Sequence, residues 1–388
     1  MKRVYKELLL IIIVASLFSM PLFFRTQPLG IDDPYYFFNH VFEKSDYFSE
    51  TTTFAKVLIF DQLPANVTLI NIILIINFLI SLIIFYYIVR MYSSRYAYLV
   101  VIAFSVFLFF SGVFLRLEDD AFAIPFMLMS LFFIIRYQLK KNFYVTFFRN
   151  RLHKILYFDN NIILSLLFLF ISVNIWRFTI YLIPIFLIMT YFEKLYVIAT
   201  ISILPFFYKL FFNILPSSTY QEYMPLNAIT PIFFLIPIYF FIKDKYTRIA
   251  VFILTIFSLL ANKYVLLLIP ILFINLATLL EQNKVKYTQN ILIYLVVIFF
   301  IAGTLTIYNG MPSNKQDELF DITQQLDKTV NIDWSFGYFA IWKNIEGVPY
   351  KTKENVYKNY VLTFKNNKNI ENCEKIKEEG EIGLYFCR

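Results

Sequence analysis

Long apolar runs are the feature that most limits how this chain can fold. Crossing about 30 Å of hydrocarbon takes roughly 17 to 25 apolar residues. Charged residues are only 16% of the 388, against roughly 25% in soluble domains. Eleven runs approach that length, at residues 8–24, 68–89, 97–115, 121–136, 161–175, 178–192, 196–215, 228–242, 248–261, 264–280 and 289–308. The sequence therefore predicts an all-α polytopic membrane protein with eleven spans, in a range of ten to thirteen.

Basic residues gather in alternate loops between these runs, and this sets the orientation. With the N-terminus in the cytosol, the inner loops hold most of the Lys and Arg residues that precede residue 309. The outer loops then hold only Arg25, Lys44, Lys56, Arg116, Arg177 and Lys263. Because cytosolic loops are enriched in Lys and Arg, we predict a multi-pass cell-membrane protein with a cytosolic N-terminus and an extracytosolic C-terminus. The excess of Lys and Arg, 35 against 27 acids, then reflects orientation, and no nucleic-acid partner is expected.

The composition changes after Tyr308, which suggests two domains. Residues 309–388 contain 11 basic and 12 acidic residues and no spanning run. We therefore predict a transmembrane catalytic domain over 1–308 and a small mixed extracytosolic domain over 309–388. Cys373 and Cys387 both lie in that tail, where oxidation is permitted, so they form either a disulfide or two free thiols.

Three adjacent acids, Glu118, Asp119 and Asp120, stand between two apolar runs with almost no loop. Ionised carboxylates at the edge of the hydrocarbon are costly without a partner, so the position favours a bound cation. Hard ions such as Mg²⁺ or Mn²⁺ take carboxylate oxygens from separate segments, and the other outer-face sources are Asp32–Asp33 and Glu222. The alternative interpretation is a solvated acidic rim.

Five short strings follow one another along the chain: 30–38 (GIDDPYYFF), 118–120 (EDD) with Pro125, 219–222 (TYQE), 263–264 (KY) with Pro270, and 333–338 (DWSFGY). In this order they resemble the motifs of the oligosaccharyltransferase catalytic subunit, a GT-C type glycosyltransferase of asparagine-linked protein glycosylation. In that family the motifs are an Asp-Pro-aromatic segment, acid-x-acid before a Pro, T-I-x-E, a basic-aromatic pair before a Pro, and W-W-D-x-G.

The resemblance implies a role for each matched residue. Asp33, Glu118, Asp120 and Glu222 would be the catalytic and metal-binding carboxylates, with Mn²⁺ or Mg²⁺ as cofactor. Lys263 would contact the lipid pyrophosphate, and Arg116 and Arg177 are further outer-face cations. Asp333, Trp334 and Ser335 would contact the acceptor. The implied partners are a lipid-linked oligosaccharide, an acceptor polypeptide and membrane lipids.

The chain also departs from the family pattern. Ser335 stands where the family has an Asp that holds the hydroxyl of the acceptor sequon. The tail is also short, and the predicted eleven spans are two fewer than the thirteen that are usual in the family. These differences indicate a divergent, short member. The alternatives are another GT-C glycosyltransferase that uses a polyprenyl-phosphate sugar, a transporter, or a non-catalytic membrane partner. A transporter would place its ionisable residues at mid-membrane.

Overall fold

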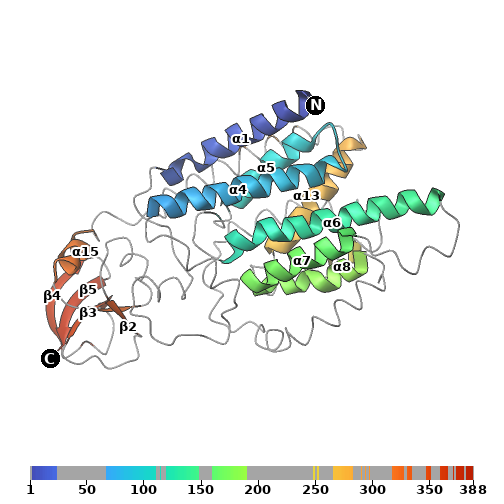
Figure 1. The fold of residues 1–388 in the computed structure, drawn as a ribbon. Helices are drawn as coiled ribbons and strands as arrows, with labels where there is room; N and C mark the ends of the chain where they lie inside the picture. The colour runs from blue at the N-terminus through green and yellow to red at the C-terminus, as the bar shows by residue number, and fades with distance from the viewer. Residues whose placement is uncertain are drawn as a thin grey trace. The chain divides into compact units, whose positions relative to one another are not determined.

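The structure is a computed structural model, and the residues that it describes are mostly helical, with a small sheet near the C-terminus (Figure 1). It divides into two compact units. The first comprises Met1–Met20, Ile75–Phe114 and Asp119–Gly303, and the second comprises Pro21–Leu74, Leu115–Glu118 and Thr304–Arg388. The residues that the structure describes are 2–23, 67–110, 114, 119–147, 160–189, 248–249, 251–252, 265–282, 290, 293, 297, 317–326, 330–333, 347–350, 359–365, 370, 373–379 and 382–387.

The described helices before the tail coincide with predicted apolar runs. They are α1 (Lys2–Phe23), α4 (Val67–Arg90), α5 (Ala97–Phe110), α6 (Asp119–Phe147), α7 (Asn160–Ile175), α8 (Leu182–Met189) and α13 (Val265–Glu281). Two of these helices contain a segment long and apolar enough to cross a membrane, Thr68–Arg90 and Asp119–Leu139. The predicted runs at 196–215 and 228–242 lie outside the described residues, so the number of eleven spans stays a prediction.

The chain is interrupted between α7 and α8, between the predicted apolar runs 161–175 and 178–192. Trp176 has an extended backbone, with φ −127° and ψ 100°, and a 3₁₀ turn, Arg177–Tyr181, follows it. The Thr179 hydroxyl donates to the Trp176 carbonyl over 2.8 Å and helps to stabilise this turn. The two apolar runs are therefore separate helices.

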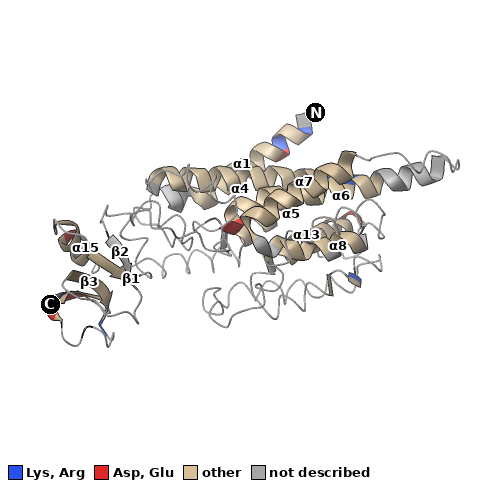
Figure 2. Ribbon diagram, turned by 60° about the horizontal axis from the view of Figure 1, so that its bottom comes forward, with Lys and Arg blue, Asp and Glu red and all other residues tan. Residues whose placement is uncertain are grey.

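Helix α1 packs through one narrow stripe. Glu7, Ile11, Ala15 and Ser19, spaced four residues apart and therefore on one helix face, are at most 9% exposed. Elsewhere on the helix several large apolar side chains are exposed, and Leu17 reaches 62%. Figure 2 shows that charged residues on α1 are confined to its N-terminal turns.

Exposed apolar stripes also run along α4 and α7. Leu69, Ile76, Ile80 and Tyr87 on α4 are 42 to 50% exposed, and Ile163, Leu167 and Phe170 on α7 are 42 to 49% exposed. Water disfavours contiguous apolar surface of this kind, which usually marks a contact with lipid or protein. The stripes agree with the association with a membrane that the apolar helices indicate.

Serine side chains join α6 to α7. The Ser130 hydroxyl donates to the Ser165 carbonyl over 2.8 Å, and the Ser165 hydroxyl donates back to the Ser130 carbonyl over 3.0 Å. Seven residues away on each helix, the Ser172 hydroxyl donates to the Ala123 carbonyl over 3.2 Å. Small polar residues allow the close approach of helices in apolar surroundings. Since numbers rise along α6 as they fall along α7, the two helices are antiparallel.

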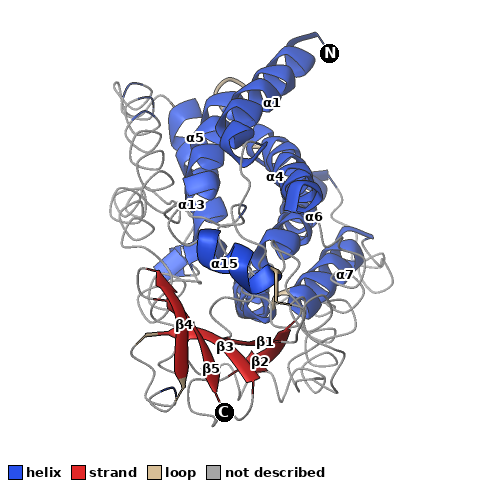
Figure 3. Cartoon of the chain, turned by 90° about the vertical axis from the view of Figure 1, so that its left-hand side faces the viewer, coloured by secondary structure: helices blue, strands red, loops and turns tan. Residues whose placement is uncertain are grey.

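The second unit contains a five-stranded mixed sheet in the order β2-β1-β3-β5-β4. The strands are β1 (Val330–Asp333), β2 (Gly347–Tyr350), β3 (Asn359–Phe364), β4 (Glu374–Glu379) and β5 (Ile382–Cys387). The β2–β1–β3 part is parallel, and β3–β5–β4 is antiparallel. Helix α15 (Asp317–Gln324) packs next to β4 and β5 with Leu319 fully buried (Figure 3).

Both edge strands of this sheet carry features that discourage further pairing. Strand β2 contains Pro349, which has no backbone N–H to donate. Strand β4 carries exposed Glu374 and Lys375, and its pairing with β5 shifts register between Lys375 and Lys377. Charges and irregularities of this kind protect sheet edges from association.

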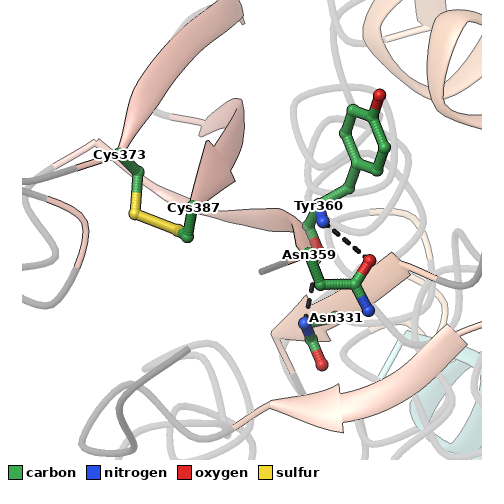
Figure 4. Close-up of a disulfide and its surroundings, with 5 residues drawn as sticks. All are labelled: Asn331, Asn359, Tyr360, Cys373 and Cys387. Atoms are coloured by element: carbon green, nitrogen blue, oxygen red, sulfur yellow. Dashed lines mark hydrogen bonds between the residues drawn. A yellow bond between two sulfur atoms is a disulfide. The ribbon is translucent and has the colours of Figure 1, made fainter. Parts of the chain in front are cut away.

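Cys373 and Cys387 are joined by a disulfide (Figure 4). Glu374 pairs with Phe386 in the antiparallel ladder of β4 and β5, so the bond closes the end of the hairpin opposite its turn. Tyr385 and Cys387 are buried with Val361 and Ile370 in one cluster, against which Cys373 packs. The two cysteines that the sequence places in the tail are therefore paired and contribute to its core.

Gly383, which has no side chain, leaves room for the Tyr385 ring of β5 to extend toward β4. A Cβ added to Gly383 would stand only 2.5 Å from the Tyr385 hydroxyl oxygen and 2.6 Å from its ring. The ring thus lies over residue 383, and its hydroxyl donates to Glu378 Oε1 over 2.8 Å. Lys365 and Lys375 also approach Glu378 Oε2, at 3.5 and 3.6 Å.

This cluster predicts that the tail loses stability at both pH extremes. The Tyr385 hydrogen bond, with the two lysines, lowers the pKa of Glu378 from its ordinary 4.5, while burial and the bond to Glu378 raise the pKa of Tyr385 above its ordinary 10.0. The Glu378 contribution is present above pH 4.5 and is lost as pH falls through the lowered value. The Tyr385 contribution is present below pH 10 and is lost as pH rises through the raised value.

The measurement is resistance of the tail to proteolysis against pH in the detergent-solubilised chain. We expect the resistance to be constant between about pH 5 and pH 9 and to fall on both sides of this range. In Tyr385→Phe, which keeps the ring but removes the hydroxyl, the resistance should depend less on pH on both sides. Tyr360→Phe is the matched control, since that ring packs on Phe386 at 5.1 Å. An unchanged pH profile for Tyr385→Phe would contradict the assignment.

Candidate functional site

The acids that open α6 are the most distinctive polar group in the described part of the first unit. Asp119 and Asp120 form the first turn of a 29-residue helix. Asp120 is only 3% exposed and Asp119 is half-buried. The helix dipole favours carboxylates at a helix N-terminus, but this preference does not by itself explain burial. For Asp120 the alternative of a solvated acidic rim is wrong.

Burial of an ionised Asp120 carboxylate costs free energy. A carboxylate taken out of water either pairs with a cation or hydrogen-bond donors, or takes up a proton. The Oδ1 atoms of Asp119 and Asp120 are buried and accept no hydrogen bond, while each residue keeps other interactions within the structure. Carboxylate oxygens are also the donor type that a hard cation prefers.

Pro125 explains how this turn is attached to α4. A proline inside a helix has no N–H for the carbonyl four residues earlier, which in α6 is the carbonyl of Ala121. The side-chain amide of Asn77 on α4 donates to this oxygen over 3.5 Å. The proline of the sequence motif thus frees an acceptor that ties the acid-bearing turn to a neighbouring helix.

Helix α7 ends beside the same turn. The Ser172–Ala123 hydrogen bond and the antiparallel direction of α6 and α7 place Trp176 level with Asp119. The Trp176 N–H donates to the Ser172 carbonyl over 2.8 Å, so the register holds up to this residue. Arg177 comes next and opens the 3₁₀ turn. The backbone of Arg177 is therefore brought to the end of the helix pair that carries Asp119 and Asp120.

The acids lie below the N-terminal end of α4. Asn77, which contacts Ala121, follows the start of α4 at Val67 by ten residues. At 1.5 Å per residue, ten residues correspond to about 15 Å of helix. The position of the acids at the edge of the hydrocarbon, which the sequence predicts, stays a prediction.

Most of the other predicted site residues lie outside the described residues. These are Asp33, Arg116, Glu118, Glu222, Lys263, Trp334 and Ser335. Asp333 ends β1, with only its backbone described. The residues that the structure brings together are thus Asp120, with its neighbour Asp119, and the backbone of Arg177.

A metal centre is not complete within the part of the chain that can be described. No group of three or more His, Cys, Asp or Glu residues suited to a metal ion occurs among the described residues. Only Asp120 of the four predicted ligands belongs to that set, so the predicted Mn²⁺ or Mg²⁺ site stays a prediction. The donor types suit it, because hard divalent ions prefer carboxylate oxygens.

Asn77 and Ser172 connect the acid-bearing end of α6 to its neighbours, although no sequence motif marks them. Both lie inside apolar runs, where isolated polar residues usually have a structural partner. Pro125 was a usable signal for the freed Ala121 carbonyl, but nothing in the sequence showed which helix supplies the donor.

No protein-family model matches the chain, and no curated protein matches it significantly.

Proposed function

We propose that the chain is a multi-pass glycosyltransferase of the GT-C type, similar to the oligosaccharyltransferase catalytic subunit. It would transfer an oligosaccharide from a polyprenyl pyrophosphate to asparagine of acceptor polypeptides at the outer membrane face. The observation that carries the proposal is Asp120, buried in the first turn of an apolar helix at the position of the acid-x-acid motif. The order of the five motifs between residues 30 and 338 supports it.

The proposed chemistry explains why carboxylates gather on one side of the membrane. An asparagine amide nitrogen is a poor nucleophile because its lone pair is delocalised into the carbonyl. Asp33, together with the acids at the start of α6, would accept hydrogen bonds from the amide N–H groups and orient the nitrogen. Asp33, Glu118, Asp120 and Glu222 would hold Mn²⁺ or Mg²⁺, which supplies Lewis-acid stabilisation of the leaving pyrophosphate.

Basic residues would hold the donor. Lys263, Arg116 and Arg177 are the outer-face cations that would contact the pyrophosphate, and charge-assisted hydrogen bonds to phosphate are roughly twice as strong as neutral ones. The position of the Arg177 backbone at the acid-bearing end of α6 and α7 supports a shared donor site. Asp333, Trp334 and Ser335 would contact the acceptor polypeptide.

The orientation belongs to the same proposal. Eleven spans would place the N-terminus in the cytosol and the tail outside the cell. Disulfides persist in oxidising compartments, and the Cys373–Cys387 bond supports an extracytosolic tail. At the opposite end of α4 from the acids stand Arg90 and Arg95, as the positive-inside rule requires of a cytosolic face.

The test is glycopeptide formation by the purified full chain with a lipid-linked oligosaccharide, a peptide containing an Asn-x-Thr sequon, and Mn²⁺. We expect transfer that stops when the metal is chelated, and no transfer to a peptide with Gln in place of Asn. A donor preference for a polyprenyl-monophosphate sugar would support the other GT-C reaction instead. Absence of transfer from both donors would support a non-catalytic member of the family.

A further inference from the structure

A polar cluster joins α1, α4, α13 and the 91–96 turn at the end of the first unit away from Asp120. We call it the basic cluster and define it by four cations: Arg3, Lys6, Arg90 and Arg95. Arg3 and Lys6 open α1, Arg90 ends α4, and Arg95 precedes α5. None of the motifs in the sequence analysis involves this cluster.

Glu7 is the centre of the contacts between α1 and α4. The Glu7 side chain is 11% exposed, and its carboxylate accepts hydrogen bonds from Arg3 Nε over 2.7 Å and from the Tyr86 hydroxyl over 2.6 Å. Arg90 donates to the Tyr86 oxygen over 3.3 Å. This chain of contacts fixes α1 against α4 and holds two cations at one end of the helices.

The turn after α4 brings in a third cation. Arg3 Nη2 donates to the carbonyls of Ser94 and Arg95, each over 3.4 Å, so α1 lies against this turn. The Ser93 hydroxyl and the Arg95 backbone N–H both donate to Glu281 at the end of α13, over 2.7 and 3.4 Å. Arg3 and Arg95 are therefore placed side by side by contacts that involve the Arg95 backbone alone.

The exposed part of the cluster is basic. Its four cations outnumber the carboxylates of Glu7 and Glu281, and both of these accept hydrogen bonds from within the cluster. The side chain of Arg3 is 64% exposed, and Lys6 and Arg95 are exposed as well. The exposed cations at this end of the helices can therefore attract an anion.

The surroundings of the cluster combine tyrosine with apolar side chains. Tyr5 is 66% exposed, and Arg95 lies over the Tyr96 ring at 5.3 Å. One and two turns along α1, Leu9 is 58% exposed and Ile13 is 49% exposed. Tyr and basic residues above an apolar band are typical of the headgroup level of a membrane.

We propose that the basic cluster binds the phosphate headgroup of an anionic phospholipid, whose acyl chains lie along the exposed apolar face of α1. The cations and tyrosines match the headgroup, and Leu9 and Ile13 match the chains, which a free phosphate lacks. The inference rests on the proposed insertion in a membrane but is independent of the proposed transferase reaction.

The test uses the full chain in mixed micelles of phosphatidylcholine with a rising fraction of phosphatidylglycerol. The thermal unfolding midpoint is followed at each fraction. We expect phosphatidylglycerol to raise the midpoint in a saturable way, and Arg95→Gln to need about a fivefold higher fraction for half of the effect. Arg136→Gln is the matched control, since it removes an exposed Arg from α6. Its titration should follow the wild type.

Three results would overturn the proposal. One is a phosphatidylglycerol titration of Arg95→Gln that equals that of the wild type. Another is an equal loss in Arg95→Gln and Arg136→Gln, which would indicate bulk charge attraction without a site. The last is a shift with inorganic phosphate alone as large as that with phosphatidylglycerol, which would exclude a role for the acyl chains.

Discussion

Asp120→Asn is expected to lower the rate of glycopeptide formation by about a hundredfold or more while leaving the fold intact. The substitution keeps the size of the side chain but removes the charge that a cation at this site requires, and losses of this order follow the removal of one electrostatic group from a catalytic centre. Asp120 is 3% exposed. Since a buried carboxylate costs free energy, the thermal unfolding midpoint should not fall.

The measurement is the initial rate with lipid-linked oligosaccharide and sequon peptide across a series of Mn²⁺ concentrations. Asp321→Asn is the control, because it removes the same charge from an exposed position on α15 in the second unit. Asp33→Asn and Glu222→Gln should cause losses similar to that of Asp120→Asn if the carboxylates act together. Full activity of Asp120→Asn would show that this buried acid serves the helix turn alone.

Removal of the disulfide is expected to destabilise the tail by about 3 kcal/mol, because Cys373 and Cys387 close a loop with a sequence separation of 14. A loss of this size raises the population of the opened tail by about a hundredfold, since 1.4 kcal/mol corresponds to tenfold. The measurement is the rate of limited proteolysis of the tail in the full chain, for wild type and for Cys373→Ser with Cys387→Ser.

The same residues test which side of the membrane the tail occupies. The chain contains only 2 Cys, so any loss of thiol labelling under non-reducing conditions reports this bond. A membrane-impermeant maleimide should label intact cells only after mild reduction with an impermeant phosphine. Labelling without reduction would contradict the disulfide, and labelling only after lysis would contradict an extracytosolic tail.

Helix positions were predictable because a spanning helix must be apolar over most of its length. The predicted runs 68–89, 161–175 and 264–280 agree closely with α4, α7 and α13. The end of α6 was not predictable, because the helix continues past the run 121–136 to Phe147 through Lys140 and Lys141. Hydropathy marks where lipid is expected and does not mark where a helix ends in water.

The candidate site was predictable only through residues that carry charge. Glu118, Asp119 and Asp120 stand out in an apolar sequence, and Pro125 marks the helix they open. The burial of Asp120, the Asn77 hydrogen bond and the position of Trp176 depend on packing between segments far apart in the chain. The small sheet was likewise hidden, because its strands are short and β1, β2 and β3 pair in parallel across long connections.

The protected edges of the tail sheet have a consequence for the acceptor in the proposed reaction. An extended polypeptide chain readily adds as a strand to an open sheet edge. Pro349 in β2 and the charged, irregular β4 make such addition unfavourable. If the proposed reaction is correct, these edges would keep an extended acceptor polypeptide from pairing with the tail sheet, so that the glycosylated product can leave.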